Sequence, residues 1–119
     1  MKDAGNRRSE FRLVDSTTVF VEVRAASHDG SSPAEIVVCS GIDISANGLQ
    51  VQLDRPLTAG SILRLGADLG GAQAPLYVVG EVRWVRPENG QYAVGFALFD
   101  SDGTDIIAWK ELIARRLVD

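Results

Sequence analysis

The chain has few of the residues that build disulfides, metal centres and nucleophilic dyads. It contains one cysteine and one histidine among 119 residues. An internal disulfide is therefore impossible, and a zinc cluster or a cysteine–histidine nucleophile pair is disfavoured. Cys39 lies in the apolar run Ile36–Cys39, which is typical of core packing. His28 lies in a polar stretch that we interpret as a surface loop.

Long apolar runs and an excess of positive charge are also missing. No run approaches the roughly 18 apolar residues that span a bilayer, and Met1 to Asn6 lack a signal-peptide core. We therefore expect a cytoplasmic protein without membrane insertion. The net charge is −4 and aromatic residues make up 7% of the chain. Both values argue against binding to nucleic acid polymers, which normally requires a broad basic surface.

The length and the remaining composition suit one soluble globular domain with a single core. The first 15 residues show no apolar period and carry several charges, which indicates a flexible N-terminal arm. Apolar residues then recur in a regular pattern up to about residue 100. We expect an arm over residues 1–15, a β-domain over 16–100 and a helix over 101–119.

The β-domain is predicted from apolar residues that alternate with polar ones, interrupted every eight to twelve residues by glycine, proline or asparagine. Six such segments favour a small antiparallel barrel or sandwich. Asn47-Gly48 is a hairpin signal, and the inward set changes from even to odd numbers across it. Two sets are expected on the inner face: Ile36, Val38, Ile42 and Ile44; and Leu49, Val51 and Leu53. Three further sets alternate so that their members share one face of a strand: Val19, Val21, Val23 and Ala25; Leu76, Val78, Val82 and Trp84; and Tyr92, Val94, Phe96 and Leu98.

The last segment changes to helical spacing. Ser101 or Asp102 is expected to cap this helix, which carries one apolar stripe. The apolar stripe packs on one end of the barrel or, alternatively, presents a surface to a partner. Its members are Ile106, Trp109, Ile113 and Leu117.

Three arginines, Arg7, Arg8 and Arg12, concentrate positive charge in the N-terminal arm. Guanidinium is planar, always charged and carries paired donors. It therefore binds phosphate, or the O6/N7 edge of guanine, with two hydrogen bonds at once. Taken alone, the same spacing also suits a solvated basic terminus.

A second polar cluster contains Asp43, Ser45 and Gly48. An aspartate accepts the N1 and N2 protons of guanine, a serine bonds phosphate or base, and a glycine lets a ligand approach the backbone. The alternative is a turn satisfied by its own Asx-type hydrogen bonds. Together the two clusters suit an anionic ligand that also presents donors, and a guanine nucleotide is such a ligand.

The order and spacing of the two clusters resemble the double motif of PilZ domains. The segment Arg8–Arg12 reads Arg-Ser-Glu-Phe-Arg, and the second cluster reads Asp43-x-Ser45-x-x-Gly48. Gly80–Trp84 and Val94–Phe99 resemble strand patterns that complete such domains. The resemblance covers most of the chain. It implies an all-β fold, a six-stranded antiparallel barrel, with a C-terminal helix and a flexible N-terminal arm.

PilZ domains are bacterial receptors for cyclic diguanylate (c-di-GMP). The resemblance implies that Arg8 and Arg12 bind guanine edges and phosphates of this ligand. It implies that Asp43, Ser45 and Gly48 hold one guanine against the barrel wall.

Two further positions follow from the same resemblance. Trp84 matches a position close to the ligand, although a core position is an equal alternative. Arg7 precedes the motif, at a position linked in the family to binding one ligand or an intercalated pair. An arginine there favours the pair.

The resemblance implies a stand-alone second-messenger receptor without catalysis, cofactor or metal. It would change conformation on binding and act on an unidentified downstream protein in motility, exopolysaccharide or attachment control. The main alternative is a PilZ-like protein-interaction module that binds no ligand. A single-strand nucleic acid binder on an OB-like barrel, or an enzyme assembled from distant residues, are further alternatives.

Overall fold

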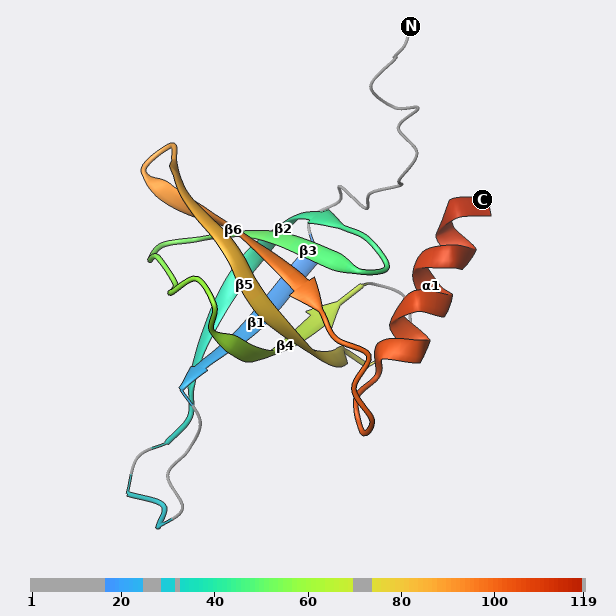
Figure 1. The fold of residues 1–119 in the computed structure, drawn as a ribbon, viewed down its shortest axis with the longest axis horizontal. Helices are drawn as coiled ribbons and strands as arrows, with labels where there is room; N and C mark the ends of the chain where they lie inside the picture. Colours follow the sequence, from blue (N-terminus) through green and yellow to red (C-terminus); the bar gives the residue numbers. More distant parts are fainter. Residues whose placement is uncertain (1–16, 25–28, 32, 70–73, 119) are drawn as a thin grey trace, which may run out of the picture.

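The computed structural model describes residues 17–24, 29–31, 33–69 and 74–118. Within them the chain forms six strands followed by one helix (Figure 1). The elements are β1 (Thr17–Arg24), β2 (Glu35–Ile44), β3 (Gly48–Leu53), β4 (Ile62–Asp68), β5 (Leu76–Glu88), β6 (Gln91–Leu98) and α1 (Ile106–Val118).

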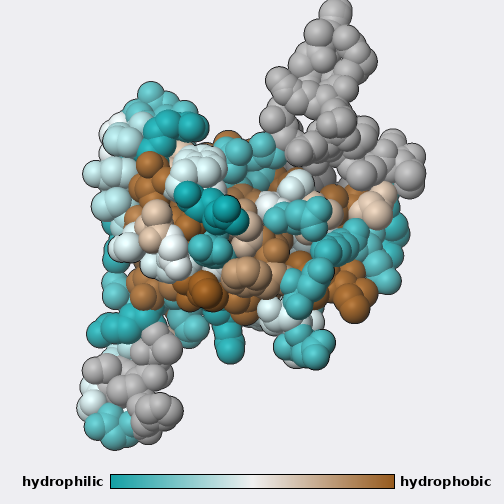
Figure 2. All heavy atoms as spheres, in the orientation of Figure 1, coloured by the Kyte–Doolittle hydropathy of each residue, from teal (hydrophilic) through white to brown (hydrophobic). Residues whose placement is uncertain are grey.

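The strands close into an antiparallel barrel in the order β1-β2-β3-β6-β5-β4. The predicted six-stranded barrel with a C-terminal helix is therefore confirmed. Hydrophobic atoms spread over the body of the barrel, while the tip of the β5–β6 hairpin is mainly hydrophilic (Figure 2). No helix in the described part of the chain is long and apolar enough to cross a membrane.

The core is the barrel interior, filled by alternate side chains of each strand. Val19 and Val21 of β1 are fully buried, and Leu49, Val51 and Leu53 of β3 are at most 3% exposed. The predicted inward positions of β3 are confirmed, and the face that Val19 and Val21 were predicted to share is the inner one.

Strand β2 begins with the opposite face inward from the one predicted. Val37 and Cys39 are buried, whereas Ile36 is 49% and Val38 is 64% exposed. The inward placement of Ile36 and Val38 was therefore wrong. The apolar residues of this strand occupy both parities, so alternation did not identify which set faces the core.

A β-bulge explains why the end of β2 nevertheless agrees with the prediction. The register with β3 shifts between Gly41 and Asp43, which inserts one extra residue, Ile42. Ile44 beyond the bulge is fully buried, while Ile42 is 36% exposed and the prediction for it was wrong. The bulge reverses the face of every later residue and leaves Asp43 on the outer wall.

Strand β5 carries a second bulge. Its register with β6 shifts between Val82 and Trp84, so Arg83 is the extra residue. Val82 is 1% exposed inside the barrel, and Val85 packs against the core. Trp84 lies on the outer wall, so of the two alternatives left open for it the core position does not hold.

Helix α1 starts at Ile106, later than predicted, because the preceding residues form a separate turn. The Thr104 hydroxyl donates a 2.6 Å hydrogen bond to the Ser101 carbonyl, and Gly103 in this turn has a φ of 81°. The first helical bond runs from the Trp109 N–H to the Asp105 carbonyl. Asp105 thus precedes the helix, and the predicted caps are part of the turn.

The apolar stripe of α1 faces the barrel. Ile106, Trp109 and Ile113 are at most 5% exposed, as predicted, and the helix stands beside the β2–β3 turn (Figure 1). The side chain of Leu117 lies outside the part that the structure describes.

Candidate ligand-binding site

The two bulges place residues from four neighbouring strands in one row on the outer wall. Asp43 of β2 pairs with Gln50 of β3, Gln50 pairs with Gly95 of β6, and Gly95 pairs with Trp84 of β5. Residues in such cross-strand pairs lie on the same face of the sheet. We call this row, with the pocket around it, the bulged face.

Trp84 lies across β6 because its partner there is a glycine. A methyl group built at Gly95 would overlap the indole ring, so any larger residue would displace Trp84. Arg86, two residues further along β5, places its guanidinium carbon 4.7 Å from the centre of the indole. The tryptophan is thus supported by the strand beneath it and carries a positive charge beside its ring.

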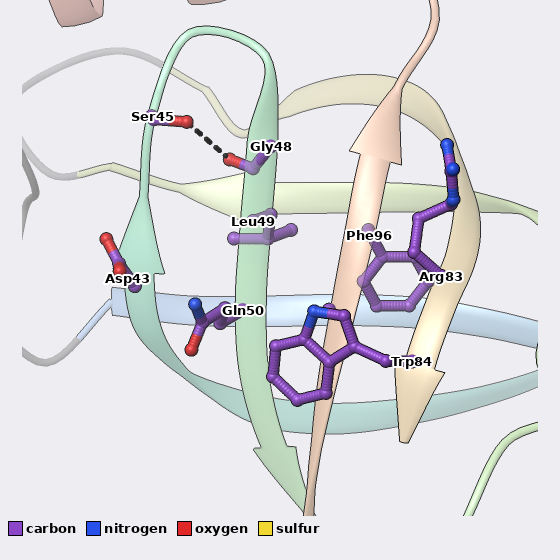
Figure 3. Close-up of a pocket in the computed structure, with 9 residues that line it drawn as sticks. Asp43, Ser45, Gly48, Leu49, Gln50, Arg83, Trp84 and Phe96 are labelled. Atoms are coloured by element: carbon purple, nitrogen blue, oxygen red, sulfur yellow. Dashed lines mark hydrogen bonds between the residues drawn. The ribbon is translucent and has the colours of Figure 1, made fainter. Parts of the chain in front are cut away.

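The β2–β3 turn forms one end of the bulged face. The Ser45 N–H donates to the Gly48 carbonyl at 3.0 Å, and the Ser45 hydroxyl donates to the same oxygen at 3.3 Å (Figure 3). The Leu98 N–H donates to the Asn47 carbonyl at 3.0 Å, which joins the turn to the end of β6. The turn is therefore held from within and from the neighbouring strand.

Gly48 is needed for close approach rather than for an unusual backbone angle. It is absent from the residues with positive φ among those the structure describes. A methyl group at Gly48 would lie 3.2 Å from the Phe96 carbonyl oxygen and 3.7 Å from the Ser45 hydroxyl. A larger residue would push the turn away from β6.

These parts enclose a pocket of about 180 Å³. Asp43 and Gln50 lie on one side of it, and Arg83 and Trp84 on the other (Figure 3). The pocket thus offers a carboxylate, an amide, a guanidinium and an aromatic ring. Its lining residues are Asp43, Ser45, Gly48, Leu49, Gln50, Arg83, Trp84, Gly95 and Phe96.

The structure brings together four of the seven residues predicted from sequence, namely Asp43, Ser45, Gly48 and Trp84. Arg7, Arg8 and Arg12 lie outside the described residues.

Sequence reasoning missed two polar residues of the pocket, Gln50 and Arg83. Gln50 had a usable signal, since it alternates with the inward Leu49 and Val51 and must point outward. Arg83 had none, because its position depends on a bulge that only strand pairing reveals.

Cys39 lies inside the barrel on the strand that carries Asp43. Burial and, second to it, the nearby Asp54 carboxylate together raise the pKa of its thiol to about 11 against the opposing effect of Arg55. The thiol is therefore protonated at neutral pH and packs in the core, as predicted. Within the described residues, no three His, Cys, Asp or Glu side chains are grouped so as to hold a metal ion.

Comparison with known proteins agrees with the fold and the motifs. The model of the PilZ domain family matches residues 6–115, which include both polar clusters. Among curated proteins, none matches the chain in sequence.

Three solved structures share the fold at low sequence identity. The Bacillus subtilis inhibitor of motility (MotI/DgrA) is 19% identical with a TM-score of 0.67, covering 94% of this chain and 52% of that one. The PilZ domain of Escherichia coli YcgR with c-di-GMP is 14% identical with a TM-score of 0.63, covering 94% of both chains. YcgR from the same organism in complex with c-di-GMP is 12% identical with a TM-score of 0.64, covering 94% of this chain and 45% of that one.

The family match spans nearly all of the chain, and the barrel is that of the solved relatives. The chain belongs to the PilZ domain family. It spans about half the length of the B. subtilis inhibitor of motility.

Proposed function

We propose that this chain is a c-di-GMP receptor whose binding site is the bulged face together with the N-terminal arginines. The observation that carries the proposal is the convergence of Asp43, Ser45, Gly48 and Trp84 in one pocket. These residues come from two separate parts of the barrel sequence, the β2–β3 region and β5, and they line the same pocket on the outer wall. The E. coli YcgR PilZ domain, whose structure contains c-di-GMP, has the same fold.

The chemistry of the pocket matches one guanine of the ligand. The Asp43 carboxylate accepts the N1 and N2 protons of the base, and the Gln50 amide offers a donor and an acceptor beside it. The Trp84 ring offers a surface on which a base can stack, and such stacking contributes about 1–3 kcal/mol per base. The Arg83 guanidinium supplies positive charge for a phosphate.

The small size of the pocket favours a binding site that the barrel shares with the N-terminal arginines. About 180 Å³ is less than the roughly 300–1,000 Å³ of pockets that enclose a drug-sized ligand. The bulged face would therefore hold one base and leave the phosphates and the second base outside. Arg8 and Arg12 would close over these parts, with Arg7 favouring an intercalated pair of ligands.

The proposed output is an adaptor role. Binding would order the arginine segment over the barrel and so change the surface offered to a downstream protein. Motility, exopolysaccharide production and attachment are the candidate processes. The similarity to a B. subtilis inhibitor of motility supports the first of these.

Titration calorimetry of the purified chain with c-di-GMP tests the proposal, with GMP and cyclic AMP as comparison ligands. Asp43→Ala removes a charge-assisted contact of about 1.5–3 kcal/mol, so we expect roughly 10- to 150-fold weaker binding. Asp54→Ala is the matched control, because this exposed carboxylate at the other end of β3 pairs only with the neighbouring Arg55 among the contacts described.

Native affinity in Asp43→Ala would contradict the assigned site. An absence of binding by the unmodified chain would overturn the receptor role and favour the ligand-free interaction module. The stoichiometry of the same titration distinguishes one ligand from a pair.

A further inference from the structure

Helix α1 is joined to the candidate site by one partly buried hydrogen bond. The indole N–H of Trp109 donates to the carbonyl oxygen of Ser45 at 2.9 Å. Trp109 is fully buried, and the two residues are 64 positions apart in the chain. A residue far from both family motifs is thus bonded directly to the second of them.

The helix that carries Trp109 is anchored at its start as well. The Asp105 N–H donates to the Tyr77 carbonyl, and the Tyr77 N–H donates to the Asp105 carboxylate, each at 2.8 Å. Ile106 and Ile113 flank Trp109 on the buried stripe. These contacts set the position of the helix on the barrel, so the indole donor is held at a defined place.

The Trp109 bond is made to the Ser45 carbonyl, which has no partner within the turn among the hydrogen bonds described. The Ser45 N–H and hydroxyl both bond to the Gly48 carbonyl within the turn. The Ser45 carbonyl instead bonds to Trp109. Because a peptide group is planar, holding this carbonyl orients the whole peptide between Ser45 and Ala46. That orientation fixes the path of the backbone into the turn, within which the Ser45 hydroxyl bonds to the Gly48 carbonyl.

We infer that Trp109 is a positioning residue for the c-di-GMP site and that it couples the docking of α1 to ligand binding. The inference rests on the proposed function. Trp109 is not among the residues that line the pocket; it acts by holding the β2–β3 turn in its binding geometry. Because coupling between two equilibria is reciprocal, bound ligand also strengthens the docking of α1.

The test compares Trp109→Phe with Ile113→Val. The first variant keeps an aromatic ring but removes the N–H, and the second trims the same buried stripe without touching Ser45. Thermal unfolding identifies a temperature at which both are fully folded, and c-di-GMP affinity is measured there. We expect about fivefold weaker binding for Trp109→Phe, the effect of one neutral hydrogen bond, and less than a twofold change for Ile113→Val.

Hydrogen exchange of the ligand-free protein provides a second measurement, which does not depend on the proposed function. In Trp109→Phe the amides of Ser45 and Leu98, which bond within and across the turn, should exchange faster. The Gly60 amide, which bonds to Val82 elsewhere in the barrel, should exchange as in the unmodified chain. If the chain binds no c-di-GMP, the receptor role fails, and hydrogen exchange alone then decides whether Trp109 holds the turn.

A measurement on the unmodified chain covers the case in which Trp109→Phe does not fold. The chain has two tryptophans, so its two indole N–H resonances are assigned with Trp84→Phe. Saturating c-di-GMP should shift the Trp109 resonance and slow its exchange. An unchanged Trp109 resonance, unchanged turn exchange, or equal affinity losses in Trp109→Phe and Ile113→Val would each overturn the inference.

Discussion

The barrel has two outer faces built on the same structural device, an aromatic ring lying over a glycine of the neighbouring strand. On the bulged face Trp84 covers Gly95. On the opposite side Tyr77 of β5 covers Gly66 of β4, where a methyl group would lie 2.7 Å from the ring. We call this opposite side, formed by β2, β1, β4 and β5, the second face.

The companions of the aromatic ring differ between the two faces. The second-face row continues from Gly66 through Phe20 of β1 to Val38 of β2, which is 64% exposed. The bulged-face row continues instead through Gln50 to Asp43. One row ends in apolar side chains and the other in a carboxylate and an amide.

The two faces differ in the chemistry of their pockets, and the polar pocket is not the larger one. The second face holds a hollow of about 270 Å³, larger than the 180 Å³ of the bulged face. Its charged residues, Glu22 and Arg64, lie 4.0 Å apart and offset each other. Bulges that turn polar residues outward beside an aromatic ring thus mark the smaller hollow as the candidate recognition site, which pocket size alone would not reveal.

The largest expected difference between the faces concerns the arginines. Arg12→Ala or Arg8→Ala should weaken c-di-GMP binding roughly 10- to 150-fold, because each removes a charge-assisted contact of about 1.5–3 kcal/mol. Arg64→Ala, on the second face, should leave affinity within about twofold. Calorimetry showing equal losses in Arg12→Ala and Arg64→Ala would remove the distinction between the faces.

The next effect concerns β2, the strand that both faces share. The pKa of Cys39 is raised from 9.0 to about 11, so the unfolded thiol loses its proton at lower pH than the folded one. The raised pKa therefore adds roughly 2–3 kcal/mol to the free energy of unfolding below pH 9, and this stabilisation is lost as the pH rises from 9 to 11. Denaturant unfolding across this window measures the loss, and Cys39→Ala should lack that part of the slope. Equal slopes in both proteins would contradict the assignment.

Replacing the two glycines compares the faces directly. Gly95→Val and Gly66→Val should each destabilise the fold by about 1–3 kcal/mol, because each forces an aromatic ring off its strand. Only Gly95→Val should also weaken c-di-GMP binding, by roughly 5- to 50-fold, through loss of stacking on Trp84. A similar affinity loss in Gly66→Val would show that the effect is general destabilisation.

The smallest effect is expected at Arg86. Its contact with the Trp84 ring is exposed and contributes about 0.5–1 kcal/mol, so Arg86→Ala should weaken binding about two- to fivefold. Trp84 fluorescence in the ligand-free protein should change as well. Unchanged fluorescence together with unchanged affinity would show that Arg86 does not hold the indole.

Much of the fold was predictable because hairpin and strand patterns are local. Leu49, Val51 and Leu53 alternate with polar residues and are buried as expected. Asn89 and Gly90 have φ values of 54° and 79°, the left-handed conformation that their predicted turn requires. The same dipeptide at Asn47-Gly48 has no positive φ, because Gly48 is already the first residue of β3 and pairs with Ala97 of β6.

The errors share one cause. Ile36, Val38 and Ile42 were assigned to the wrong face because alternation was extended through a strand that begins on the other parity and contains a bulge. A bulge depends on the pairing of two strands, and local sequence does not encode it. Asp43 was expected on the outer wall and is found there only because the bulge at Ile42 corrects the parity of β2.

The amino-acid pattern alone was sufficient for the number of strands, the hairpins, the two polar clusters and the family, since these depend on residue type and short spacing. Tertiary structure decided which face Trp84 occupies, that Gln50 and Arg83 join the pocket, and that Trp109 bonds to a turn 64 residues earlier. The physical reason is that register and docking are properties of pairs of elements. They arise only when the barrel closes and distant backbone groups compete for the same partners.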